Sequence, residues 1–158
     1  MPPLTSIDES FFHTAPIRMV DILEIPRPAE DVWAELVEEH PLGWLRLIKR
    51  IDWTSPRPFG VGTTRTARTT GGLYVINERF IVWEEGRRMA FGVETANLPV
   101  FRSFGEDYIV EPLSADRCRF TWTIAGRPHP LIAPIAAPLR KLGARSLFGD
   151  ARRHFGIR

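Results

Sequence analysis

The sequence predicts an α+β protein in which a long C-terminal helix crosses the concave face of a curved antiparallel sheet of about seven strands. Between residues 48 and 125, most segments have an apolar period of two, which is typical of strands. Short turns separate these segments and favour antiparallel neighbours over helical crossovers. Helical periodicity is confined to residues 28–47, where we expect two short helices, and to the chain beyond residue 130.

The N-terminal segment contains one strand and the two short helices. Residues 1–15 have no clear periodicity, so we expect an irregular lead-in. Residues 17–25 are rich in β-branched side chains and are followed by two prolines, which indicates a strand and its end. Pro28 suits the first position of a helix, because a proline there loses no hydrogen bond. A second short helix is predicted over residues 42–47.

Six further strands are expected, bounded by glycine, proline, serine and asparagine turns. The last of them shows the facing most clearly, because Cys118, Phe120, Trp122 and Ile124 alternate with polar residues. One face of the sheet should therefore be apolar and the other wet. The six predicted strands are residues 48–54, 63–69, 73–83, 88–94, 101–110 and 117–125.

The C-terminal segment carries two apolar stripes at helical spacing. They consist of Ile132, Ile135, Leu139 and Leu142, and of Leu147, Phe148, Ala151 and Phe155. The stripes are rotated relative to each other, and Gly143 and Gly149 lie near the change. We therefore expect a helix that begins near Pro138 and bends or changes its facing around these glycines. A strongly curved sheet cannot close fully on one helix, so a cavity is expected between them.

Composition sets the class of protein. The 158 residues suit one domain over residues 1–158, and 44% hydrophobic with 25% charged residues is ordinary for a globular chain. A net charge of +2 argues against general nucleic-acid binding. Cys118 is the only cysteine, so no internal disulfide can form, which fits a reducing cytoplasm. The sequence shows neither a signal peptide nor a long apolar run, and we expect a cytoplasmic protein.

Four motifs, taken together, resemble a known superfamily. They are residues 26–33 (PRPAEDVW), 59–63 (FGVGT), 78–83 (ERFIVW, followed by Phe91) and 119–123 (RFTWT). Their order and spacing over about residues 17–157 are similar to those of the START-like, Bet v 1-like helix-grip (SRPBCC) superfamily, and more closely to its polyketide cyclase/dehydrase and lipid-transport branch. The resemblance implies the helix-grip fold. It does not specify one function, because the superfamily includes ligand carriers, cyclases, hydroxylase domains and toxin or regulatory members.

Strand alternation assigns side chains to the expected cavity. On strand 73–83 the inward residues would be Tyr74, Ile76, Glu78, Phe80 and Val82, and on strand 101–110 they would be Arg102, Phe104, Glu106, Tyr108 and Val110. A buried carboxyl has a raised pKa, which a nearby arginine such as Arg102 would lower. Glu78, Glu106 and Tyr108 are therefore candidate acid–base groups. The alternative is that each glutamate is a solvated strand residue or part of an ordinary ion pair.

The remaining candidates are apolar or aromatic ligand contacts, as is typical of small-molecule pockets. The predicted ligand-binding residues are Tyr74, Ile76, Phe80, Phe91, Arg102, Phe104, Phe120, Trp122, Ile135, Leu139 and Leu142. The four histidines are widely separated and no CxxC motif occurs, so we expect no metal site and no cofactor.

These observations favour binding or transport of a small hydrophobic ligand such as a lipid, a polyketide-like aromatic or an isoprenoid. One alternative is a cyclase or dehydratase that uses the cavity carboxylates and tyrosine, and another is a protein-interaction or toxin-like module. From Leu139 onward the chain has six basic residues and one acidic residue. This basic segment could contact anionic membranes weakly or could simply be a solvated helix face. No nucleic-acid partner is expected.

Overall fold

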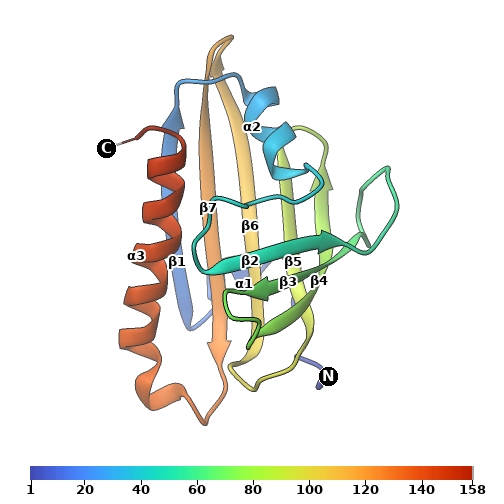
Figure 1. Cartoon of the computed structure of the whole chain (residues 1–158), viewed down its shortest axis with the longest axis vertical. Helices are drawn as coiled ribbons and strands as arrows, with labels where there is room; N and C mark the ends of the chain where they lie inside the picture. The colour runs from blue at the N-terminus through green and yellow to red at the C-terminus, as the bar shows by residue number, and fades with distance from the viewer. Residues whose placement is uncertain (158) are drawn as a thin grey trace.

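A computed structural model describes residues 1–157 of the chain and shows one antiparallel sheet with a long helix beside it (Figure 1). The strand order is β1-β7-β6-β5-β4-β3-β2, so consecutive strands pair except at β1, which pairs with β7. The elements are α1 (Phe11–Thr14), β1 (Ile17–Ile25), α2 (Ala29–Leu36), β2 (Ile48–Trp53), β3 (Thr64–Thr69), β4 (Val75–Glu84), β5 (Arg88–Ala96), β6 (Phe101–Ser114), β7 (Arg117–Pro128), the 3₁₀ helix η1 (Ala133–Ile135) and α3 (Ala136–His154).

The predicted helix-grip class is confirmed, because seven strands form the curved sheet and α3 lies against it. The strand prediction for residues 17–25 matches β1, and the other strands are found within a few residues of their expected positions. Among residues 1–157, no helix is long and apolar enough to cross a membrane.

A register shift in β4 changes the facing of its last residues. The shift lies between Phe80 and Val82 in the pairing with β5. Beyond it, Trp83 packs against the main core, whereas Val82 belongs to a separate small cluster with Phe12. The expectation that Val82 faces the cavity is therefore wrong, because a bulge reverses strict alternation.

The second short helix predicted over residues 42–47 is also wrong. Leu42 has a φ of 60°, which a helix cannot include, and its carbonyl accepts a turn hydrogen bond from the Leu45 amide. Both leucines are buried, so the apolar spacing that suggested a helix instead serves a turn that packs on the core. A short helix occurs in the N-terminal lead-in, where α1 buries Phe12.

The C-terminal helix is uninterrupted from Ala136 to His154 and follows η1 directly (Figure 1). The predicted start near Pro138 agrees with the observed one within two residues, whereas the predicted bend or change of facing is wrong. Ala136, Gly143 and Leu147 all face the interior, and Ala151 continues the same stripe into the core. The sequence pattern misled because it followed large apolar side chains, whereas the inward face of the first half of α3 carries small ones.

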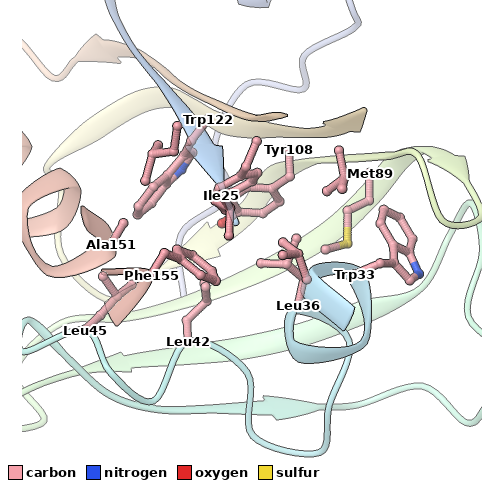
Figure 2. Packing of buried hydrophobic residues seen from close by; sticks show 14 of the residues in the cluster. Ile25, Trp33, Leu36, Leu42, Leu45, Met89, Tyr108, Trp122, Ala151 and Phe155 are labelled. Carbon is pink, nitrogen blue, oxygen red and sulfur yellow. The ribbon is translucent and has the colours of Figure 1, made fainter. Parts of the chain in front are cut away.

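The packed core fills part of the concave side. Figure 2 shows α2, the turn around Leu42 and Leu45, and the end of α3 meeting the sheet at Tyr108 and Trp122. Phe155 packs edge-on against Phe120, with 6.3 Å between ring centroids. Beside this core, the concave side includes a hollow.

Candidate functional site

The hollow is a cavity of about 300 Å³ between the sheet, the turn at residues 42–47 and the first half of α3. Most of its walls are aliphatic or aromatic side chains, including Met19, Ile51, Phe104 and Ile124. Its volume is at the lower end of the range of about 300–1,000 Å³ that small-molecule pockets occupy.

Small residues on α3 account for the space. Ala136 and Gly143 line the cavity, where a larger side chain would fill it. A Cβ atom added at Gly143 would meet no heavy atom within 4 Å. The small residues at positions 136 and 143 therefore leave room in the cavity on the side of the helix.

A buried ion pair forms one part of the polar wall. Arg65 on β3 lies opposite Glu78 on β4 in the strand register, and its Nε donates a hydrogen bond to Glu78 Oε2. The two side chains are 1% and 3% exposed. Burial raises the pKa of the Glu78 carboxyl, and the charge of Arg65 opposes that rise. The Arg65 guanidinium keeps its charge, since the neighbouring carboxylate outweighs desolvation and raises its pKa.

The rest of the guanidinium lies among aromatic rings. Its carbon is 4.8 Å from the ring centroid of Phe91, 5.0 Å from that of Phe80 and 5.3 Å from that of Trp53. Arg65 Nη1 and Nη2 have no hydrogen-bond partner among the described residues. Cation–π contact with these rings therefore adds to the stabilisation that the guanidinium receives from Glu78 and Glu106.

Glu106 on β6 is the ionisable group that lines the cavity beside this pair. The Tyr108 hydroxyl donates to its Oε2 at 3.0 Å, and Trp122 Nε1 donates to its Oε1 at 3.1 Å. Desolvation and the nearby Glu78 raise the pKa of Glu106 to about 7, although Arg65 and the two hydrogen bonds act to lower it. Near neutral pH this carboxyl can therefore either hold or release a proton.

The two tyrosines remain uncharged. Burial raises the pKa of Tyr74 to about 12, and burial together with Glu106 raises that of Tyr108 well above its usual range. Tyr74 lines the cavity, so its phenol can reach a bound molecule. Tyr108 lies behind Glu106 and acts on the cavity through the carboxyl that it contacts.

The predicted site residues fall into three groups. Those that line the cavity are Tyr74, Ile76, Glu78, Phe104, Glu106, Trp122 and Leu139. Those that lie in the packed core and do not line the cavity are Phe80, Phe91, Tyr108 and Phe120. Those that lie outside both are Arg102, Ile135 and Leu142.

The third group requires correction. Arg102 is exposed because the pairing of β6 with β7 shifts register between Phe101 and Ser103, which places Phe101 in the cavity wall instead. Ile135 and Leu142 are exposed because the inward stripe of α3 passes through Ala136, Leu139 and Gly143.

Sequence reasoning missed Arg65, the arginine that does face the carboxyls. The only available signal was its position two residues before Ala67, since residues two apart in a strand share a face. The surrounding threonines and arginines gave no apolar alternation to confirm it. Within residues 1–157, no group of three His, Cys, Asp or Glu side chains is placed to hold a metal ion.

The curved sheet, the long helix and the partly polar cavity between them define a helix-grip protein. The chain belongs to the polyketide cyclase/dehydrase and lipid transport family, whose model matches residues 17–155. An uncharacterised protein of Mycobacterium tuberculosis is 34% identical over 165 residues, covering 100% of this chain and 96% of that protein.

Solved structures show the same fold at low sequence identity. A START superfamily protein from Mycobacterium smegmatis has a TM-score of 0.62 and 14% identity, covering 84% of this chain and 94% of its own. Norcoclaurine synthase from Thalictrum flavum has a TM-score of 0.60 and 18% identity, covering 85% and 89%. These similarities confirm the fold predicted from the four motifs.

Proposed function

We propose that the protein binds a small hydrophobic molecule carrying one oxygen-containing polar group in the cavity between the sheet and α3. The observation that carries this proposal is the apolar cavity with Glu106 as a cavity-facing hydrogen-bonding group. Apolar walls with few polar groups are typical of small-molecule sites, in which the polar groups fix ligand orientation.

The hydrogen bonds of Glu106 indicate which polar groups a ligand could carry. Both carboxyl oxygens of Glu106 already accept a hydrogen bond from the protein. When the carboxyl is protonated and Tyr108 and Trp122 still donate to its oxygens, its own O–H can donate to a third group in the cavity. A ketone, ester or carboxylic acid oxygen fits below the pKa of Glu106, and a ligand hydroxyl can donate to the carboxylate above it.

Fluorescence titration with the uncharged dye N-phenyl-1-naphthylamine tests cavity binding. The wild-type protein should enhance the dye's emission with saturation. Gly143→Leu, which places a side chain in the cavity, should weaken binding by at least tenfold. Gly149→Leu is the matched control, because Gly149 lies on the same helix, does not line the cavity and has equal room for a side chain.

Failure of the wild-type protein to bind the dye, or equal weakening by the two leucine variants, would contradict the proposal. Native mass spectrometry of freshly purified protein gives an independent measurement. A bound small molecule lost in Gly143→Leu and kept in Gly149→Leu would identify the natural ligand by mass.

A second candidate function is acid–base catalysis on a polyketide-like ketone, as in a cyclase or dehydratase. The observation that favours it is the pKa of about 7 at a carboxyl that faces the cavity, since a general base works best when its pKa is close to the working pH. Ionised Glu106 would take the proton from the carbon beside the ketone, and Tyr74 is the cavity phenol available to hydrogen-bond the oxygen.

Deuterium exchange at that carbon provides the test. With the apolar ketone 1-tetralone in D₂O, the protein should accelerate exchange measured by NMR, and Glu106→Gln should abolish the acceleration. Glu111→Gln, at an exposed position of the same strand, should leave it unchanged. Equal exchange rates with Glu106→Gln and with the wild type would exclude this catalytic role. The proposal of ligand binding would not be affected by that result.

A further inference from the structure

The surface over the start of α3 is unusually apolar. Leu131, Ile135, Leu139 and Leu142 are 74%, 53%, 50% and 65% exposed. They lie within twelve residues of one another, on η1, the turn before it and the first half of α3. Single exposed leucines are ordinary, but gathered ones mark a surface that contacts something apolar.

Cations without carboxylate partners accompany these leucines. Arg140, Lys141 and Arg145 form no ion pair with any residue of the described chain, residues 1–157. No acidic residue occurs between Asp116 and Asp150 in the sequence. By contrast, Arg152 pairs with Asp21 at 2.5 Å and Arg153 with Asp150 at 3.0 Å. The basic C-terminal segment is thus divided into a paired end that holds α3 in place and an unpaired start.

This surface is next to the cavity. Leu139 and Arg140 line the cavity, and Leu139 is also half-exposed on the outer surface. Leu47, immediately before β2, likewise both lines the cavity and is exposed. The cavity therefore approaches the surface between β2 and the first half of α3, beside the exposed leucines.

We propose that the surface formed by Leu131, Ile135, Leu142, Lys141 and Arg145, here called the docking face, binds the surface of an anionic lipid bilayer. The three apolar side chains enter the boundary between headgroups and acyl chains, while the two cations contact lipid phosphates. This orientation places the cavity entrance against the membrane. Vesicle binding is measured with no ligand added. The proposals of membrane docking and of ligand binding can therefore fail independently.

Charge decides between a bilayer and a second copy of the chain. A symmetric dimer through the docking face would bring Lys141 and Arg145 of one copy towards those of the other, with no nearby carboxylate to compensate. An anionic bilayer supplies the missing negative charge and an apolar layer at the same time. We therefore assign the face to lipid.

Co-sedimentation with vesicles tests the assignment. The wild-type protein should bind phosphatidylcholine vesicles that contain one third phosphatidylglycerol at about 0.01 M ionic strength and be released at about 1 M salt. Each basic residue near an anionic surface contributes roughly fivefold to partitioning, so Lys141→Gln/Arg145→Gln should weaken binding about 30-fold. Ile135→Gln/Leu142→Gln should also weaken binding, and neither residue lines the cavity.

Two control pairs match these changes elsewhere on the surface. Arg87→Gln/Arg117→Gln removes the same charge at the β4–β5 turn and at the start of β7, at the opposite end of the sheet from η1 (Figure 1). Glu24, which lies 3.5 Å from Arg117, keeps its ion pair with Arg119 at 3.1 Å in this control. Val61→Gln/Leu113→Gln removes two other exposed apolar side chains. Both controls should bind vesicles like the wild type.

Three results would overturn the assignment. The first is absence of wild-type binding to the anionic vesicles at low salt, and the second is equal weakening by test and control pairs. The third is a wild-type dimer, measured by light scattering, that Ile135→Gln/Leu142→Gln converts to a monomer. That result would show that the face binds a second copy instead.

Discussion

At the scale of single residues, Glu106 shows how neighbours set a charge state. Burial and Glu78 favour its neutral form, whereas Arg65, Tyr108 and Trp122 favour its ionised form. The balance leaves its pKa at about 7, well above the ordinary glutamate value of about 4.3. Because the folded protein then holds a proton that the unfolded chain has lost, stability must fall as pH rises between these two values.

We expect the free energy of unfolding of the wild type, relative to Glu106→Gln, to fall by about 3 kcal/mol between pH 4 and pH 8. The decline should flatten above pH 8, where Glu106 is ionised in both states. Urea denaturation at a series of pH values measures the difference. Glu111→Gln, at an exposed site, should parallel the wild type. Parallel curves for Glu106→Gln and wild type would show that Glu106 titrates normally.

The Arg65–Glu78 pair gives a second prediction at this scale. Arg65→Met should lower the free energy of unfolding by about 3–5 kcal/mol, because it leaves the buried Glu78 carboxylate without a counter-ion. Arg65→Met/Glu78→Met should cost less than the sum of the two single changes, since no buried charge remains. A double-mutant cycle in urea measures this coupling, and additivity within about 0.5 kcal/mol would show that the pair does not interact.

Residue-level prediction from sequence succeeded where alternation was regular. Glu78 and Glu106 were assigned to the interior because apolar residues two positions away share their face. Arg102 was misplaced because a register shift has no signature in a single sequence. Arg65 was missed because burial of an arginine depends on a partner from another strand, which alternation within one strand does not reveal.

At the scale of elements, the ion pairs that hold α3 in place all lie near its C-terminal end, among the described residues. Asp150 is buried, and its carboxylate accepts hydrogen bonds from the Arg46 amide at 2.9 Å, the Arg46 side chain at 2.8 Å and Arg153 at 3.0 Å. His154 lies 3.0 Å from Glu35 of α2. The first half of α3, over the cavity, has no comparable ion pair among the described residues.

Asp150→Asn should therefore loosen the end of α3. Burial alone would raise the pKa of Asp150, but the hydrogen bonds and charge of Arg46 outweigh it and lower that pKa, so the carboxylate is the form that stabilises the fold. We expect a loss of about 1–3 kcal/mol and faster hydrogen exchange in the second half of α3 and in residues 42–47. Asp116→Asn, in the exposed β6–β7 turn, is the control. Unchanged exchange in both segments would contradict this role.

Element-level prediction from sequence was accurate for strands and weaker for helices. Alternation and turn residues located all seven strands. Leucines at helical spacing misled at residues 42–47, because Leu42 adopts a positive φ that lets both leucines reach the core without a helix. The facing of α3 was misjudged because Ala136 and Gly143, which carry the inward stripe, contribute little to an apolar pattern.

At the scale of the whole molecule, a ligand that binds only the folded state must stabilise it. N-phenyl-1-naphthylamine at about 100 times its Kd should add about 2.7 kcal/mol to the free energy of unfolding and raise the Tm by about 5–10 °C. Differential scanning calorimetry measures the shift. Gly149→Leu should keep the shift and Gly143→Leu should lose it. A shift of equal size in both variants would place the dye outside the cavity.

The placement of alanine and glycine on the inner side of α3 separates two properties of the cavity. The buried ionisable groups Arg65, Glu78 and Glu106 come from β3, β4 and β6, whereas the helix leaves room at positions 136 and 143. Alanine, valine and leucine at position 143 should thus lower, step by step, the size of the largest ligand that the cavity accepts. The hydrogen-bonding chemistry at Glu106 should not change. Discrimination by size and discrimination by polar group can therefore change independently in this scaffold.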